Sequence, residues 1–309
     1  MARPRKPLTA GRVTATALAL TCFAFAGRAA AEAAPNRQRS DGYYVSNLSA
    51  LFVLASAGYF LDRQPAPETC RCDFDWFPGD ESLRGKHSRG ADAVSNAFLY
   101  TTLTAPLLAS LGSFGFHLRA ANQGVVYGEA VSANFALNRI TKQLFSRARP
   151  YTYSTRLRQF REGESDYDAS FYSGHASTAF AGAMAASYLY GEGAPGSPWA
   201  RRSVWTTEFA LAAATAVLRT RAGKHYYSDV LVGAVVGTAI GVLIPVAHGG
   251  QYLPKTGDYI AGVSGIAIGI ATGALWPFQD DGGRVLSGWS IAPLFASTGS
   301  VGIQTSGVW

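Results

Sequence analysis

Residues 173–191 read SGHASTAFAGAMAASYLYG, a helical pattern with a recognisable start. Ser173 stands where an N-cap belongs, because a serine hydroxyl can accept a hydrogen bond from an amide of the first turn. Residues 176–190 are mostly apolar or small and predict an apolar helix. Gly174 leaves room for a ligand near the backbone, and the amides and dipole of a helix start favour a bound anion. We therefore expect a helix with an anion site at its beginning.

Long helical patterns dominate the chain from residue 91 onward. The expected helices cover roughly 93–118, 121–147, 173–191, 202–221, 226–248 and 257–276. In the fifth of these, Gly233, Gly237 and Gly241 place small residues four apart on one face, which allows close helix packing. This order of elements predicts an all-α fold, a helical bundle of about six core helices.

The N-terminus has the layout of a secretory signal peptide. A basic start is followed by an apolar run over residues 13–27, and Ala31 and Ala33 are small residues at the two positions that a signal peptidase reads. We expect a signal peptide over residues 1–33. The alternative is an uncleaved anchor helix, although this apolar run is short for a span of about 20 residues. Removing residues 1–33 takes away five basic residues and one acidic residue, so the net charge of +7 exaggerates the case for a nucleic-acid partner.

The regions on either side of the main helices are less regular. Residues 43–61 predict a helix of moderate apolarity, whereas residues 64–90 are rich in Pro, Cys, Asp and Gly and predict a loop or a partly ordered insertion. Cys70 and Cys72 lie in that region, and a disulfide between them stays open because one intervening residue would strain it. Near the C-terminus, residues 289–304 partly alternate around a Thr-Gly turn, which predicts a short C-terminal β-hairpin packed on the bundle. The expected regions are 1–33 for the signal peptide, 34–90 for a helix and Cys-containing loop, 91–280 for the helical domain and 281–309 for the hairpin tail.

Composition leaves membrane embedding open. Charged residues make up 15% of the chain, well below the level of about 25% in ordinary globular proteins, yet the mean hydropathy is only +0.06. Segments 230–245 and 258–276 are apolar enough to span a bilayer, and 96–116 is close. Segment 121–147 is not convincing because its polar residues would have to face the bundle interior. No basic stripe with interleaved aromatic residues is present, so we expect no nucleic-acid partner.

Two segments besides the start of 173–191 carry candidate chemistry. In KQLFSRARP, residues 142–150, Lys142 and Arg149 are seven apart, close to two helical turns, so both cations are expected on one side before Pro150 ends the helix. Such cations suit a phosphoryl group, because arginine supplies a bidentate fork and lysine a point charge. Taken alone, a basic helix end is more often a solvated terminus.

The second segment is RTRAGKHYYSD, residues 219–229. His225 and Asp229 are four apart, so on a helix the carboxylate would lie one turn below the imidazole and could hold one ring N–H. An imidazole oriented in this way can attack phosphorus and form a phosphohistidine. Arg219 adds a third cation. His175, beside the expected anion site, could protonate a leaving oxygen. A single His-x3-Asp pair is commonly only a helix salt bridge.

Together these residues form the pattern KxxxxxxRP, SGH and RxxxxxHxxxD. It resembles the type 2 phosphatidic acid phosphatase and vanadium haloperoxidase superfamily, over about a third of the chain. The resemblance implies a phosphatidic acid phosphatase type 2-like helical domain over residues 91–280, and no metal or other cofactor. This sequence departs from the usual pattern at two positions: the family usually has proline in place of Tyr172 and serine in place of Leu218.

The resemblance also implies a role for each matching residue. His225 would be the nucleophile, His175 the general acid and Asp229 the partner that orients His225. Phosphate oxygens would be bound by Lys142, Arg149, Ser173, the amide of Gly174, and Arg219. Among the residues outside the pattern, His87, His117 and His248 are expected to be structural or on the surface. Arg147, Arg221 and Lys224 are expected to be flanking, solvated charges.

The sequence therefore predicts a metal-independent phosphatase of the cell envelope that hydrolyses phosphate monoesters or lipid (pyro)phosphates through a phosphohistidine. The alternatives are a vanadium-dependent haloperoxidase and a non-catalytic phospholipid-binding envelope protein. The expected partners are the membrane and a phosphorylated lipid or small ester. If residues 43–61 do not cross the membrane, the active site faces the periplasm, and if they do, it faces the cytoplasm.

Overall fold

The computed structural model describes residues 41–62, 77–114, 118–154, 167–193, 197–277, 290–295 and 301–306. The expected signal peptide, Cys70, Cys72 and His117 lie outside these residues.

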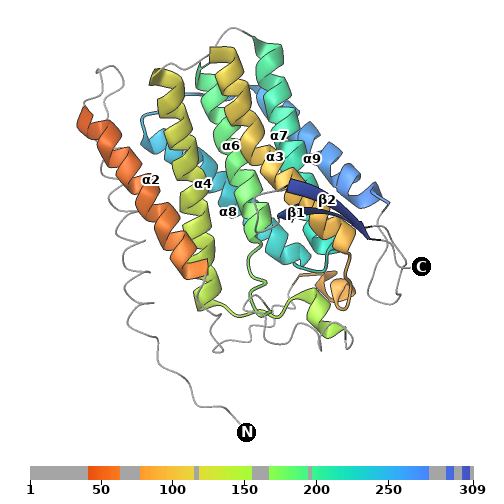
Figure 1. The fold of residues 1–309 in the computed structure, drawn as a ribbon. Helices are drawn as coiled ribbons and strands as arrows, with labels where there is room; N and C mark the ends of the chain where they lie inside the picture. The colour runs from red at the N-terminus through yellow and green to blue at the C-terminus, as the bar shows by residue number, and fades with distance from the viewer. Residues whose placement is uncertain are drawn as a thin grey trace.

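Seven α-helices make up the described part of the chain up to residue 277, which confirms the all-α prediction (Figure 1). They are α2 (Asp41–Asp62), α3 (Arg89–Phe114), α4 (Leu118–Leu144), α6 (Gly174–Gly193), α7 (Pro198–Arg221), α8 (Tyr227–Ala247) and α9 (Thr256–Leu275). Two short 3-10 helices, η1 (Asp80–Leu83) and η2 (Pro150–Tyr153), lie in the connections. Strands β1 (Ser290–Phe295) and β2 (Val301–Ser306) are paired antiparallel; the packing of this hairpin on the bundle stays a prediction.

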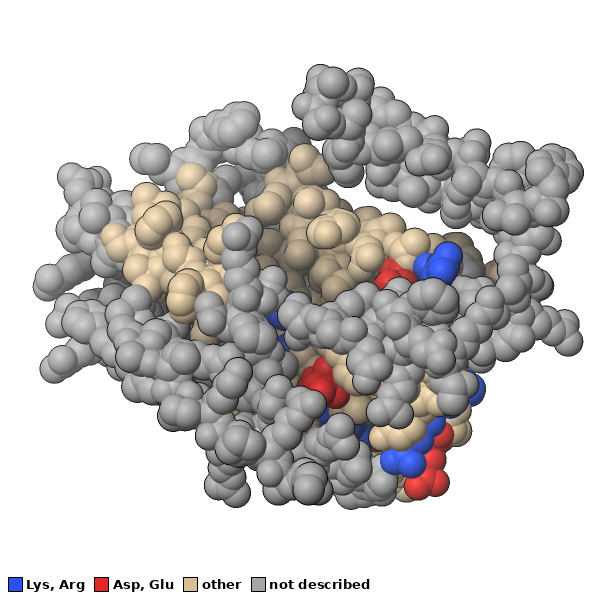
Figure 2. Space-filling view, turned by 60° about the horizontal axis from the view of Figure 1, so that its bottom comes forward, with Lys and Arg blue, Asp and Glu red and all other residues tan. Residues whose placement is uncertain are grey.

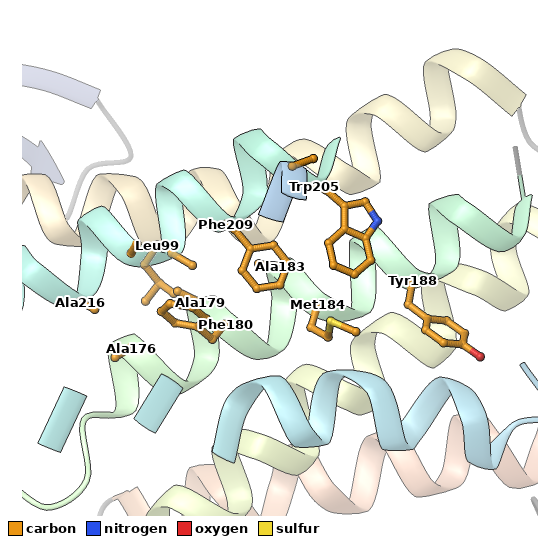
Figure 3. Close-up of a cluster of buried hydrophobic side chains, with 13 residues drawn as sticks. Leu99, Ala176, Ala179, Phe180, Ala183, Met184, Tyr188, Trp205, Phe209 and Ala216 are labelled. Atoms are coloured by element: carbon orange, nitrogen blue, oxygen red, sulfur yellow. The ribbon is translucent and has the colours of Figure 1, made fainter. Parts of the chain in front are cut away.

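Helix α6 lies at the centre of the bundle, and most of its side chains are small enough to be surrounded. Its alanines from 176 to 186 are buried, and Ala176, Ala179 and Ala183 join the largest apolar cluster together with Phe180 and Met184 (Figure 3). Helix α7 contributes Trp205 and Phe209 to the same cluster, their rings stacked with centroids 5.5 Å apart. The small residues of α6 thus allow neighbouring helices to approach it closely.

The predicted close packing at the glycines of α8 is confirmed. A Cβ atom at Gly237 would lie 2.0 Å from the carbonyl oxygen of Ser177, and one at Gly241 would lie 2.6 Å from that of Ala181. At Gly233 the distance to the carbonyl oxygen of Ser173 would be 2.8 Å. The contacts advance along both helices in the same direction, so α6 and α8 are parallel and begin at the same end of the bundle.

The polar residues of α4 face the interior. Asn134 donates to the hydroxyls of Ser177 and Thr178 at 3.1 and 3.0 Å, and Glu129 pairs with Nε2 of His248 at 2.5 Å. Because these polar groups make their hydrogen bonds inside the bundle, they do not oppose an apolar exterior.

Much of the exterior is apolar. Helices α8 and α9 are the two helices among the described residues that are long and apolar enough to cross a membrane, and only 22% and 33% of their most apolar windows are buried. Exposed apolar side chains on α8 and α9 include Leu231, Val235, Leu243, Ile260, Val263 and Leu275.

Gly237→Ala tests the α6–α8 contact. The added methyl group would collide with backbone rather than with a movable side chain, so we expect a loss of stability of about 1–3 kcal/mol, measured by chemical denaturation followed by circular dichroism. Gly124→Ala in α4 is the matched control, because nothing lies within 4 Å of a Cβ atom there, and it should leave stability unchanged or raise it. Equal stability of the two variants would contradict the close contact.

Candidate functional site

The residues predicted to bind and transfer phosphate come from helix ends that meet at one end of the bundle. Helices α4 and α7 end there, and α3, α6 and α8 begin there (Figure 1). Figure 2 turns the lower side of Figure 1 toward the viewer. On the described surface there, basic and acidic residues lie near one another.

The pKa of His175 is affected by charged residues from several of these helix ends. Burial holds the pKa of His175 well below its ordinary value, and the charges of Arg219, His225, Lys142 and Arg149 lower it further. Charges shift a pKa in this way only over limited distances, so His225 and the three cations from separate segments lie close enough to act on His175. The lowered pKa favours the neutral form of His175. A bound phosphate dianion would reverse the sign of the local field and favour its protonated form.

Arg149 reaches the site by a route that the sequence did not predict. Helix α4 ends at Leu144, so Arg149 is not two turns below Lys142 on one helix; it lies in extended backbone before η2. Pro150 explains the extended backbone of Arg149, because proline disfavours helical backbone in the residue before it. The Arg149 guanidinium is almost fully buried and donates to the carbonyl oxygen of Lys224 at 3.1 Å. This arginine is fixed by backbone acceptors and has little freedom to move.

The turn before α6 has the form expected of an anion site. The Ser173 hydroxyl accepts from the amide of Ala176 at 3.3 Å, as an N-cap does. Asn138 on α4 holds the turn by donating to the carbonyl oxygen of Tyr172 at 2.9 Å. A Cβ atom at Gly174 would lie 2.8 Å from Oδ1 of Asn138, so glycine is needed there for the turn to approach α4.

His175 has a partner that the sequence did not indicate. Its Nε2 lies 2.7 Å from Oδ1 of Asn96 on α3. An amide oxygen only accepts, so this geometry places a proton on Nε2.

His225 is oriented differently from the prediction. It precedes α8, whose N-cap is Tyr226, so His225 and Asp229 are not stacked on one helix. The Nδ1 atom of His225 donates to the carbonyl oxygen of Ser170 at 2.8 Å, whereas Oδ2 of Asp229 is 3.7 Å away. Because a carbonyl oxygen can only accept, Nδ1 carries the proton and the lone pair is on Nε2. Asp229 acts through Ser170, whose hydroxyl donates to Oδ2 of Asp229 at 2.5 Å.

The expectation that Arg147 is a solvated flanking charge was wrong. Its side chain is 3% exposed and donates to Oδ1 of Asp229 at 2.6 Å and to Oδ2 of Asp80 at 3.0 Å. The guanidinium also lies over the ring of Tyr226, 4.0 Å from its centroid. The guanidinium of Arg147 can be buried because it pairs with two buried carboxylates.

The remaining basic residues also have acceptors in the fold. Arg219 pairs with Asp92 on α3 and lies 3.4 Å from the hydroxyl of Ser95. Nζ of Lys224 is 4.0 Å from Asp92. Arg221 is half-buried and donates to carbonyl oxygens at the end of α9, at Gly273 and Trp276, so it caps that helix.

The two described histidines outside the pattern, His87 and His248, are structural. His87 is buried beside Tyr151, with Nδ1 3.1 Å from the carbonyl oxygen of Ala222, and His248 pairs with Glu129 at the end of α8. Gly223, in the connection between α7 and α8, has φ +70°, and a Cβ atom there would overlap the carbonyl oxygen of Lys86. Residues 84–88 thus support the loop that carries His225.

Sequence reasoning missed four residues that the structure places at or beneath the site. Asp80, Asp92, Asn96 and Asn138 belong to no short motif. The first three lie in a region predicted as a loop or at the start of a helix, where carboxylates and amides are ordinary. Asn96 and Asn138 had one local signal, since they are polar residues within helical patterns, whereas Asp80 lies in a segment that is mostly polar.

The geometry can be set beside known proteins. No curated protein and no solved structure matches this chain. A family model described as the PAP2 superfamily matches residues 123–252, which include Lys142, Arg149, Ser173, His175, Arg219, His225 and Asp229. Members of this superfamily are phosphatases or haloperoxidases. Residues 123–252 thus match the superfamily of the type 2 phosphatidic acid phosphatases, as the three motifs predicted.

Proposed function

We propose that the protein is a metal-independent phosphohydrolase that transfers a phosphoryl group to His225. The observation that carries the proposal is the bond from Nδ1 of His225 to the carbonyl oxygen of Ser170, together with the nearby cations of Lys142, Arg149 and Arg219. This bond fixes the tautomer whose lone pair is on Nε2. The cations supply the charge stabilisation that the phosphoryl oxygens need in the transition state.

In the first half-reaction, Nε2 of His225 attacks phosphorus and a P–N bond forms. The P–O bond to the leaving group breaks, its electron pair stays on the leaving oxygen, and His175 supplies the proton. The phosphoryl oxygens lie against Lys142, Arg149 and Arg219, and against the Ser173 hydroxyl and the Gly174 amide at the start of α6.

In the second half-reaction, water attacks the phosphohistidine. Now-neutral His175 takes a proton from that water, the P–N bond breaks, and its electron pair returns to Nε2 of His225. Asp229 keeps the imidazole in place throughout by holding the Ser170 hydroxyl. Phosphate is released, and both histidines regain their starting protonation states.

The substrates in this proposal are phosphate monoesters or lipid (pyro)phosphates of the cell envelope. Helix α8 has 21 residues, a length of about 31 Å, close to the thickness of a bilayer core. His225 precedes its first turn, so if α8 spans the membrane, the site lies at the membrane surface, at the level of a lipid phosphate. We place it on the periplasmic side of an exported protein whose catalytic domain is residues 91–280.

His225→Ala tests the nucleophile. We expect turnover of a chromogenic phosphate monoester to fall by at least about a thousandfold, while the melting temperature stays within a few degrees. Wild-type protein quenched during turnover should contain a phosphoenzyme that is labile in acid and stable in base, and the variant should contain none. Bromide oxidation by the vanadate-loaded protein, without ester turnover, would instead identify a haloperoxidase.

The pH dependence of kcat/KM tests His175. The pKa of His175 in the free protein is below 6.5, so the proton-donating form is present only at acidic pH and is lost as the pH rises through that pKa. We expect kcat/KM for an ester with a poor leaving group to fall from acidic toward neutral pH. His175→Asn should be much slower on that ester and should lose this limb.

The control for this experiment is the leaving group itself. An ester with a good leaving group needs no proton, so it should be much less sensitive to His175→Asn. Equal losses for both esters would remove His175 from the role of general acid.

A reporter fused after Pro150 tests the orientation. We expect alkaline phosphatase, which folds only after export, to be active at this position, and a cytoplasmic fluorescent reporter to be dark. The reverse result would place the site in the cytoplasm.

A further inference from the structure

Beneath the site, two carboxylates share one arginine. Asp80 and Asp229 are both fully buried, and Arg147 donates Nη2 to the first at 3.0 Å and Nη1 to the second at 2.6 Å. Asp80 also accepts from the amide and the hydroxyl of Ser228. We call Asp80, Arg147 and Asp229 the carboxylate–arginine cluster. Asp80 lies on η1, well before residues 123–252, so the family match does not contain it.

The cluster is connected directly to the proposed nucleophile. Ser170 bonds to it twice, through its hydroxyl to Asp229 and through its amide to the carbonyl oxygen of Arg147 at 3.0 Å. The carbonyl oxygen of the same serine accepts from Nδ1 of His225. A change of charge or position in the cluster therefore reaches the imidazole through a single residue.

The formal charges of the cluster do not cancel. With Asp229 alone, the guanidinium of Arg147 would neutralise the carboxylate that lies 3.7 Å from His225. Asp80 competes for the same guanidinium, so the three groups together carry a formal charge of −1. In a buried position an uncompensated charge acts strongly on its neighbours, because the local dielectric is low.

Phosphoryl transfer creates a charge that this excess can stabilise. When Nε2 of His225 bonds to phosphorus while Nδ1 keeps its proton, the ring becomes a phosphoimidazolium with a positive charge. The electron pair of the broken P–O bond leaves with the oxygen that His175 protonates. A net negative group behind the ring favours this product over the neutral imidazole.

We propose that Asp80 is a positioning residue for this reaction: it engages Arg147, leaving Asp229 negative, and so stabilises the positive charge on His225 during phosphoryl transfer. This inference rests on the proposed phosphohistidine chemistry. It assigns a role in the reaction to a residue of the connection before α3.

The test compares charge states of the cluster. Asp80→Asn keeps the size and an acceptor oxygen but brings the cluster to a formal charge of zero. The double variant Asp80→Asn with Arg147→Gln restores −1 while removing the bridge. Glu81→Gln, an exposed neighbour on the same 3-10 turn, is the matched control. Each folded variant is mixed with a chromogenic phosphate monoester in a stopped-flow instrument, and the burst of leaving group gives the rate of phosphoryl transfer and the apparent Kd separately.

We expect Asp80→Asn to slow the burst by about ten- to a hundredfold, with the apparent Kd changed less than threefold, and Glu81→Gln to match the wild type. The double variant should regain most of the lost rate, which loss of a merely structural bridge would not allow.

A burst in folded Asp80→Asn as fast as in Glu81→Gln would overturn the proposal, and so would a folded double variant slower than Asp80→Asn. If Asp80→Asn does not fold, the folded double variant decides alone, and a tenfold or greater loss in it overturns the proposal. A wild-type protein without any phosphoenzyme would instead refute the proposed function itself.

Discussion

The direct backbone contact between α6 and α8 is the constraint on which the site depends. Gly233 and Gly237 let α8 lie against the carbonyl oxygens of Ser173 and Ser177, and the amide of Ser173 donates to the carbonyl oxygen of Asp229 at 3.1 Å. Because the helices are parallel, both N-termini are held at the same level. The turn that carries His175 and the segment that carries His225 thus meet without a long loop to position either of them.

This arrangement also determines the electrostatics of the end of the bundle. Helices α3, α6 and α8 begin there, so three partially positive N-termini face the same region. Lys142 and Arg219 come from the last turns of α4 and α7, where the helix dipole itself favours a cation. Each helix therefore brings to the site a charge that its own end tolerates, and the combined field attracts an anion. The cost of the concentrated positive charge is offset by Asp80, Asp92 and Asp229.

The parts of this design that could be predicted from sequence are those carried by local patterns. The helical patterns identified α3, α4, α6, α7, α8 and α9, and hydrogen bonds between the three motif segments show that these segments meet. The errors arose where long-range contacts override local geometry. The spacing of Lys142 and Arg149 suggested one helix face, but α4 ends at Leu144 and Pro150 keeps Arg149 extended. Likewise, the four-residue spacing of His225 and Asp229 suggested a direct pair, whereas the chain places the carbonyl oxygen of Ser170 on the imidazole.

Arg147 shows why the rest could not be predicted. The segment that contains it singles out Arg149 and gives no sign that Arg147 is buried, yet Arg147 bonds to the carboxylates beneath the site. In a regular extended strand, residues two apart lie on the same side. The chain departs from a regular strand here, because Arg147 forms a bridge with Ala169, whereas Arg149 directly precedes η2 and donates to the carbonyl oxygen of Lys224. The partner that makes its burial possible, Asp80, is 67 residues away in the chain. A buried charge is stable only when its counter-charge is also buried, and the identity of that counter-charge is a property of the folded bundle, which no motif of nine residues contains.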